Sequence, residues 1–327
     1  MSRFALAVTR MLTMGALMAL AASVAAQQAY PNKPIRMIVP FPPGGTNTIV
    51  ARIVGQKLTE NWGQPVVVDN RPGGNTIIGT DALAKSAPDG YTLILVSSAH
   101  ILNSVLLPNL PYDSIKDFAP VTLTTVGQYT LVVHPSLPAN NLRELIALAK
   151  AKPGQLNYST SGTGGVQHLA GELFNIMAGV KTQHIPYKGA GPALTDLLGG
   201  QVQFSFQPPS NVLAHIKSGR LRIIAIPNDA RLAVLPDAPT FAEAGMPGFE
   251  VKSWTGVLAP ANAPKAIIDK LSAEIGTILA LPDIRQKMLD QGIDPYSCTP
   301  EQFGALMKAE VARVANTVKI ANIKLED

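Results

Sequence analysis

Short apolar runs alternate with helical stripes along most of the chain. Residues 35–39 form an apolar run that ends in a turn rich in Pro and Gly, and a stripe with four-residue spacing follows from Val50 to Leu58. Apolar runs between turn signals are typical of buried strands, whereas the four-residue spacing is typical of a helix. The pattern predicts a strand, a loop and a helix that has Thr46 as its N-cap and ends at Gly63.

The same alternation continues to the C-terminus. A Thr-Pro-Glu-Gln sequence at 299–302 has the form of a capping box with Pro in the first turn, and so predicts the start of a last helix. Short strands without polar alternation are buried on both faces, so we expect mainly parallel sheets. Strands are predicted at 66–68, 91–96, 131–133, 184–185, 202–206 and 221–226, and helices at 77–84, 142–149, 166–177, 266–281 and 284–289.

Two α/β halves account for the 327 residues, because this length exceeds one small core and suits two domains of about 100–200 residues each. The sequence contains no flexible linker between the halves. We therefore expect two closely packed domains, with the chain crossing from one to the other. We place the crossings near Val126 and Arg231. Domain I then comprises 27–126 and 232–327, and domain II comprises 127–231.

Residues 1–26 have the pattern of an export signal. Residues 1–10 contain Arg3 and Arg10 and no acidic residue, and a short apolar run follows them. Val24-Ala25-Ala26 then provides the small residues that a signal peptidase requires for cleavage before Gln27. A membrane-spanning helix would need about 20 apolar residues, more than this run contains. We therefore predict a cleaved signal peptide and a periplasmic mature protein.

Composition excludes several classes of function. Apolar residues make up 46% and charged residues 15%, which permits a packed core and argues against intrinsic disorder. Without Arg3 and Arg10 the net charge falls from +5 to +3 (27 − 2 = 25 bases against 22 acids). The sequence has no stripe of basic residues interleaved with aromatic residues, so it does not indicate nucleic-acid binding. The single cysteine, Cys298, excludes a disulfide framework and cysteine-based metal sites. The five histidines leave a His/carboxylate metal site possible, but no HExxH sequence occurs. We predict neither a metal nor a cofactor.

Two glycine-rich turns carry the candidate chemistry. Residues 42–47 (Pro-Pro-Gly-Gly-Thr-Asn) and 161–165 (Ser-Gly-Thr-Gly-Gly) each follow a predicted strand and open a predicted helix. The first N–H groups of a helix lack partners within it, and the helix dipole adds positive partial charge there. Glycine lets an anion approach the backbone, and Thr46, Ser161 and Thr163 add hydroxyl donors. Each turn could hold one carboxylate or phosphate, and the two would face each other across a cleft.

Other interpretations of these residues remain open. Either turn alone is better explained as an ordinary connection between a strand and a helix, whereas two matching turns in an exported chain favour binding. Neither is a nucleotide motif, and no serine has the G-x-S-x-G environment of an esterase. His100 follows a strand, where α/β proteins bind ligands, and His168 lies about one turn into the helix after the second turn.

A series of motifs resembles one family along essentially the whole mature chain. The chain is similar to the periplasmic solute receptors of tripartite tricarboxylate transporters, the Bug receptors. The motifs are VPFPPGG at 39–45, NRPG at 70–73, APDGYTL at 87–93, KDFAPV at 116–121, HLAGE at 168–172, PYKG at 186–189, ALTDLLGG at 193–200 and LPDAPT at 235–240.

The resemblance implies a two-domain α/β periplasmic-binding-protein fold of the Venus-flytrap type, with strands that cross between the domains. A carboxylate would be gripped in the cleft between the two glycine-rich turns, and variable residues at its far end would set specificity. Together with the strand-end and helix side chains, the expected ligand-binding residues are Phe41, Pro42, Gly44, Gly45, Thr46, Asn47, Ser97, Ser98, His100, Ser161, Gly162, Thr163, Gly164, Gly165, His168, Tyr187 and Gln207.

Two positions depart from the family pattern. Thr48 stands where the family's first helix has Asp, and Gln207-Pro208 replaces Asp-Asn after a strand. Either these positions do not contact the ligand, or the pocket lacks the acids that would hold an ammonium group. The second interpretation disfavours an amino acid and favours a dicarboxylate, aliphatic or aromatic.

We therefore expect a monomeric periplasmic receptor that captures a small carboxylate for a tripartite tricarboxylate-type transporter and has no catalytic residues. A ligand-loaded sensor that docks on a membrane kinase or chemoreceptor would use the same fold. An exported ester hydrolase is a third alternative, which would require Ser97 or Ser161 beside a histidine held by a carboxylate.

Overall fold

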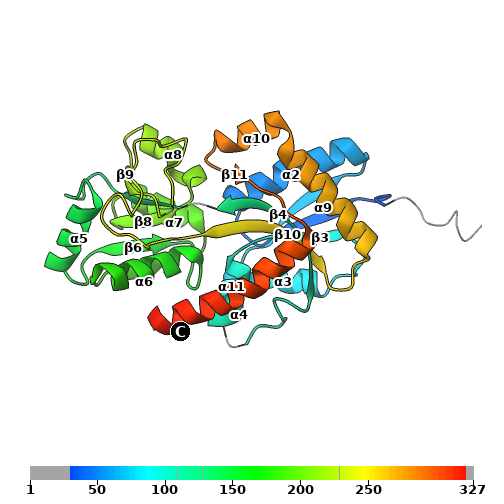
Figure 1. Ribbon diagram of the computed structural model, residues 1–327, viewed down its shortest axis with the longest axis horizontal. Helices are drawn as coiled ribbons and strands as arrows, with labels where there is room; N and C mark the ends of the chain where they lie inside the picture. The colour runs from blue at the N-terminus through cyan, green and yellow to red at the C-terminus, as the bar shows by residue number, and fades with distance from the viewer. Residues whose placement is uncertain (1–29, 108, 128, 228, 322–327) are drawn as a thin grey trace, which may run out of the picture.

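The computed structural model describes residues 30–107, 109–127, 129–227 and 229–321. They form two lobes that lie side by side, each built on one β-sheet (Figure 1). The predicted signal peptide lies outside the described residues. Across these ranges no helix is both long enough and apolar enough to span a membrane.

Lobe 1 is built on a six-stranded sheet with the order β11-β4-β10-β3-β1-β2. Its strands are β1 (Ile35–Val39), β2 (Val66–Asn70), β3 (Thr92–Ser97), β4 (Phe118–Gly127), β10 (Ser253–Pro260) and β11 (Asp294–Pro295). Its helices are α2 (Thr46–Trp62), the short 3-10 helix η1 (Gly74–Thr76), α3 (Ile77–Ala84), α4 (Ala99–Leu106), α9 (Lys265–Ala280), α10 (Pro282–Leu289) and α11 (Pro300–Ala321).

Lobe 2 is built on a five-stranded sheet with the order β7-β6-β8-β5-β9. Its strands are β5 (Thr130–Val133), β6 (Asn157–Thr160), β7 (Gln183–Pro186), β8 (Phe204–Gln207) and β9 (Arg222–Ala225). Its helices are α5 (Leu142–Ala151), α6 (Val166–Ala178), α7 (Ala190–Leu198) and α8 (Pro209–Lys217).

The side chains of β1 explain why helices cover both faces of the first sheet. Successive strand residues point to opposite faces. Met37 and Val39 pack into a core with α2, α9 and α10, whereas Ile38 belongs to a second core with α3, α4 and α11. All three side chains are fully buried. The two sets of helices lie above and below the sheet in Figure 1.

Local signals position the ends of several helices. Gly63 closes α2 in the left-handed conformation at φ 67°, and its N–H donates to the carbonyl of Thr59 at 2.9 Å. At the start of α11, the Thr299 N–H donates to Gln302 Oε1 at 3.0 Å, and the Gln302 N–H donates to Thr299 Oγ1 at 3.2 Å. The predicted capping box is confirmed by these two reciprocal bonds.

The expectation of mainly parallel sheets is wrong for the strands that join the lobes. β1 is parallel to β2 and β3, and β6 is parallel to β7 and β8. In contrast, β10 is antiparallel to β3 and β4, and β5 is antiparallel to β8 and β9. The chain leaves the first sheet through β4 and returns to it from the other lobe through β10. Because these two strands lie side by side, they run in opposite directions.

The two crossings lie at different distances from the predicted positions. β4 ends at Gly127, one residue after Val126, and leads into β5. The segment after β9 stays in lobe 2, because Phe241 and Phe249 stack at 4.2 Å between ring centres and Phe249 also lies 5.7 Å from Phe206 of β8. We therefore propose that the return crossing follows residue 251, later in the chain than Arg231.

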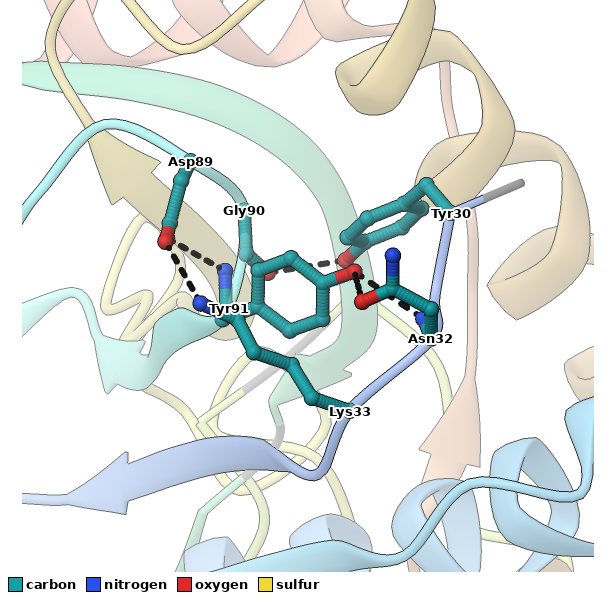
Figure 2. A network of polar contacts seen from close by, with 6 residues as sticks. All are labelled: Tyr30, Asn32, Lys33, Asp89, Gly90 and Tyr91. Carbon is teal, nitrogen blue, oxygen red and sulfur yellow. Dashed lines mark hydrogen bonds and ion pairs between the residues drawn. The ribbon is translucent and has the colours of Figure 1, made fainter. Parts of the chain in front are cut away.

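The start of the described chain is fastened to lobe 1 by a polar network (Figure 2). The Tyr30 hydroxyl donates to the Gly90 carbonyl at 2.8 Å, and Lys33 forms an ion pair with Asp89 at 3.1 Å. Gly90 has φ +81°, and a Cβ there would lie 2.5 Å from a side-chain atom of Ile267. The APDGYTL motif at 87–93 therefore has a structural role at this position.

Candidate ligand-binding site

The two glycine-rich turns end in the same backbone conformation. In the first, Gly44 has φ +95° and Gly45 follows as the N-cap of α2 at φ −84°, ψ 172°. In the second, Gly164 has φ +80° and Gly165 follows as the N-cap of α6 at φ −85°, ψ 174°. Neither helix has a side-chain hydrogen bond at its N-cap. Both helix ends therefore present first-turn N–H groups that a bound anion could satisfy.

The prediction of Thr46 as N-cap is wrong by one residue. Gly45 has the extended conformation of an N-cap, and Thr46 is already the first residue of α2. This frees the Thr46 side chain from a capping role, and its Oγ1 lies 2.6 Å from Ser210 Oγ of α8 in lobe 2. The hydroxyl pair joins the two lobes directly.

Asn70 fixes the first turn, although the sequence did not predict it as a site residue. Its Nδ2 donates to the Phe41 carbonyl at 2.9 Å and to Thr48 Oγ1 at 2.9 Å. Asn70 ends β2, which pairs with β1, so the turn that leaves β1 is held from the neighbouring strand. Thr48 is 1% exposed, and the bond from Asn70 gives its buried hydroxyl a partner.

Side chains from the first turn of α6 reach back to hold the second turn. Gln167 Oε1 accepts from the Ser161 N–H at 2.7 Å, and His168 Nδ1 accepts from the Gly164 N–H at 3.2 Å. These amides are therefore occupied within the protein. Thr163 and Gly165 keep N–H groups without a partner among the described residues, and they are the turn's free donors.

The turns meet residues of the opposite lobe. Gly189 of lobe 2 lies against Pro42, because a Cβ at Gly189 would be 2.7 Å from Pro42 Cγ. A Cβ at Gly162 would be 3.3 Å from Asn75 Oδ1 of lobe 1. With the Thr46–Ser210 pair, these contacts place both glycine-rich turns at one junction between closed lobes.

The loop around Asn75 is strained where it meets lobe 2. Asn75 and Thr76 have φ of 50° and 76°, a left-handed conformation that residues other than glycine rarely adopt. Asn103 supports the loop by donating to the Asn75 carbonyl and to Thr76 Oγ1. Strain of this kind is concentrated at functional sites, where surrounding bonds hold it in place.

One buried polar atom lacks a partner beside each turn. Within the described residues, Asn47 Nδ2 on the first turn of α2 and Ser159 Oγ near the end of β6 are buried without a hydrogen bond. Buried polar groups are nearly always paired, so such atoms indicate a place where a water molecule or ligand atom completes the set. Their positions next to the two turns agree with an anion site at this junction.

His100 does not lie at this junction, contrary to the sequence-based expectation. Its side chain is 1% exposed and packs between the rings of Tyr112 and Phe118, at 6.1 and 4.9 Å between ring centres. Its Nε2 donates to the Ser114 carbonyl at 2.8 Å. Burial lowers the pKa of His100 to about 4, so the ring is neutral at pH 7. The segment between α4 and β4, which includes Tyr112 and Ser114, packs over the ring and buries it.

Three other predicted side chains are already engaged within the protein. Ser98 is 1% exposed, and its Oγ lies 3.0 Å from Ser253 Oγ. Gln207 is fully buried, and its Nε2 donates to Ser205 Oγ. The Tyr187 hydroxyl donates to Asp196 at 2.6 Å, so its proton is not free for a ligand. Ser97 is partly exposed at the end of β3, and its Oγ accepts weakly from the Ala99 N–H at 3.3 Å.

No group of three or more His, Cys, Asp or Glu side chains that could hold a metal ion occurs in the described part of the chain. A hollow of about 530 Å³ lies between α9 and the start of α11 and includes Cys298. Its lining contains none of the residues of the two turns. The helix ends and unpartnered atoms at the lobe junction therefore remain the candidate site.

Comparison with known proteins identifies the fold and the family. Residues 50–323 match the family described as "Tripartite tricarboxylate transporter family receptor". The chain is 41% identical over 309 residues to protein BugT of Bordetella pertussis, with 94% of each chain covered.

Two solved structures extend the comparison. "R. palustris Rpa4515 with adipate" has a TM-score of 0.87 and 33% identity, with 90% of this chain and 99% of that one covered. "MatC (Rpa3494) from Rhodopseudomonas palustris with bound malate" has a TM-score of 0.83 and 31% identity, with 88% and 100% covered. The expected two-domain α/β periplasmic-binding-protein fold is confirmed. The chain belongs to the receptor family of the tripartite tricarboxylate transporters, the family that its sequence motifs resemble.

Proposed function

We propose that this receptor captures a small dicarboxylate at the junction of its lobes, with one carboxylate held between the turns at 41–47 and 161–165. The observation that carries the proposal is the pair of uncapped helix N-termini with matching conformation, one from each lobe. Their N–H groups and dipoles favour a negative charge placed between them. The relatives with adipate and malate support the same class of ligand, because both molecules are dicarboxylates.

The proposed ligand contacts are the hydrogen-bond donors at the lobe junction that have no partner within the described part of the protein. Asn47 Nδ2 and the amides of Thr163 and Gly165 are donors without a partner among the described residues, so they are the proposed carboxylate contacts. Phe41, Pro42 and Gly44 shape the first turn around them. Thr48 and Gln207 bring no negative charge to the junction, so a second carboxylate would be tolerated, whereas an ammonium group would lose its hydration without a counter-charge.

The same groups argue against the hydrolase alternative. Neither Ser97 nor Ser161 hydrogen bonds to a histidine in the described residues, and the nearby His168 Nδ1 is occupied by the Gly164 N–H. A serine nucleophile would require a histidine base within hydrogen-bond reach.

We propose a non-enzymatic receptor that is exported to the periplasm, is monomeric and delivers its ligand to membrane transporter subunits.

A thermal-shift screen of the mature protein, residues 27–327, tests the ligand class. We expect dicarboxylates such as malate and adipate to raise the melting temperature in proportion to the logarithm of their concentration. Gly162→Val should abolish the shift, whereas Gly154→Val, at a glycine with φ +73° and open space around it, should keep it. Stabilisation by amino acids alone, or by no carboxylate at all, would refute the proposed ligand.

A further inference from the structure

Four aromatic rings form a stack directly behind the second glycine-rich turn. His168 of α6 and His184 of β7 lie 4.0 Å apart between ring centres at 15°. Tyr158 of β6 stacks on His184 at 5.2 Å, and Phe204 of β8 stacks on Tyr158 at 5.5 Å. A Cβ at Gly171 would lie 2.2 Å from the Tyr158 ring, so glycine at this position lets α6 lie against the stack.

Both histidines are tied to the backbone of the turn. His168 Nδ1 accepts from the Gly164 N–H at 3.2 Å. His184 Nε2 lies 2.7 Å from Thr160 Oγ1, which itself donates to the Gly162 carbonyl at 2.9 Å. Because the Thr160 proton is committed to Gly162, His184 Nε2 must be the donor to Thr160. Each ring therefore fixes one peptide group of the turn.

The bond to His168 requires a neutral imidazole, whereas the bond from His184 needs only a proton on Nε2. His168 can accept at Nδ1 only when that nitrogen carries no proton, and His184 donates with Nε2. Burial lowers the pKa of His184 to about 3, with a further lowering from the charge that His168 would carry. Burial also lowers the pKa of His168, and Glu172 opposes this shift. The Glu172 carboxylate accepts from the Tyr158 hydroxyl at 2.6 Å, which places it at the edge of the same stack.

We propose that His168 and His184 are positioning residues that set the conformation of the turn at 161–165 before a ligand arrives. His168 removes the Gly164 amide from the set of ligand donors and leaves those of Thr163 and Gly165. His184 acts through Thr160 and fixes the Gly162 peptide. The inference rests on the proposed function of this turn, and it explains how a glycine-rich segment, with high backbone entropy when free, is held ready for an anion.

The decisive variants are His168→Phe and His168→Asn. Phe keeps a ring in the stack but has no acceptor, whereas the Asn side-chain oxygen stands close to the place of Nδ1. We expect amide hydrogen exchange at Gly164, followed by ¹⁵N NMR on the mature protein, to be about tenfold faster in His168→Phe, the factor for one lost hydrogen bond. His168→Asn should restore the wild-type rate. Unchanged exchange in His168→Phe, or failure of His168→Asn to restore it, would overturn the proposal.

Calorimetry with malate and adipate separates this proposal from the proposed function. We expect about tenfold weaker affinity in His168→Phe and near wild-type affinity in His168→Asn. Faster Gly164 exchange with unchanged affinity would refute the turn as the ligand site and leave the positioning role intact. If His168→Phe does not fold, Thr160→Val and Thr160→Ser give a parallel test on the His184 side. The Gly162 N–H donates to Thr160 Oγ1 at 3.3 Å, and of the two variants only Ser keeps the hydroxyl, so Gly162 exchange should be faster in Thr160→Val alone.

Discussion

At the scale of single residues, Gly189 controls how closely the lobes approach. Its φ of +120° favours glycine, and a Cβ would lie 2.7 Å from Pro42 Cγ. We predict that Gly189→Ala weakens binding of malate or adipate at least about fivefold, because overpacking of one contact costs about 1–3 kcal/mol in the closed state. Gly154→Ala, at a glycine with φ +73° and open space around it, is a control for a positive φ without a close contact. Equal affinities of the two variants in calorimetry would contradict the prediction.

His100 should make the protein sensitive to acid. Its pKa is lowered to about 4 in the folded protein, below the ordinary value of 6.5. Between these values the unfolded chain binds a proton and the folded chain does not, so stability falls as the pH falls through this window. For this residue we expect a loss of about 2 kcal/mol between pH 7 and pH 5.

Urea unfolding of the wild type and of His100→Gln at both pH values measures this loss. Gln can still donate to the Ser114 carbonyl but does not titrate. The variant should be less stable than the wild type at pH 7 and lose about 2 kcal/mol less on acidification to pH 5. Parallel losses in both proteins would show that His100 does not cause the acid sensitivity.

The residues of the site differ in how far the sequence predicts them. Glycines 44, 45, 162, 164 and 165 were predicted from their place between a strand and a helix, and the matching dihedral angles follow from that local pattern. Asn70 and Ser210 were missed, because their roles depend on strand pairing and on the approach of the other lobe. His100 was misplaced for a related reason, since burial is set by the loop that packs over it.

At the scale of elements, α2 and α8 are joined by a single hydroxyl pair between the lobes. Thr46 Oγ1 and Ser210 Oγ lie 2.6 Å apart. We predict that Thr46→Val and Ser210→Ala each weaken ligand binding about fivefold, the equivalent of about 1 kcal/mol for one hydrogen bond. The double variant should be no weaker than either single variant, because the two residues share one interaction.

A double-mutant cycle measured by calorimetry tests this coupling. Thr277→Val is a suitable control, because Thr277 Oγ1 bonds only within α9, to the Ala273 carbonyl. Its affinity should equal that of the wild type. Additive losses in the double variant would mean that Thr46 and Ser210 act independently of each other.

Elements with strong local patterns were predicted well. β1 coincides with the predicted run at 35–39, and α3 coincides with 77–84. The strands β4 and β10 were not predicted as elements, although they form the connection between the lobes. Their pairing joins residues more than one hundred positions apart, which no local window contains. The later return crossing that we propose rests on a similar long-range contact, since Phe241 and Phe249 pack against Phe206 of lobe 2.

At the scale of the whole molecule, the lobes are joined by β4 and β10 and by α11, which also contacts α6 of lobe 2. Such a connection permits hinge closure around a ligand. We predict that the radius of gyration measured by small-angle scattering decreases when malate or adipate is added to saturation. Gly189→Ala should show a smaller decrease than Gly154→Ala. An unchanged radius in the wild type, with binding shown by calorimetry, would contradict closure on ligand.

A crystal structure of the mature protein with the dicarboxylate that gives the largest thermal shift tests the central claim most directly. We predict one carboxylate between the two glycine-rich turns, within about 3.2 Å of the amide nitrogens of Thr163 or Gly165 and of the first turn of α2. Asn47 Nδ2 should then have a hydrogen-bond partner. A ligand bound elsewhere, or held by one lobe only with the turns apart, would contradict the account.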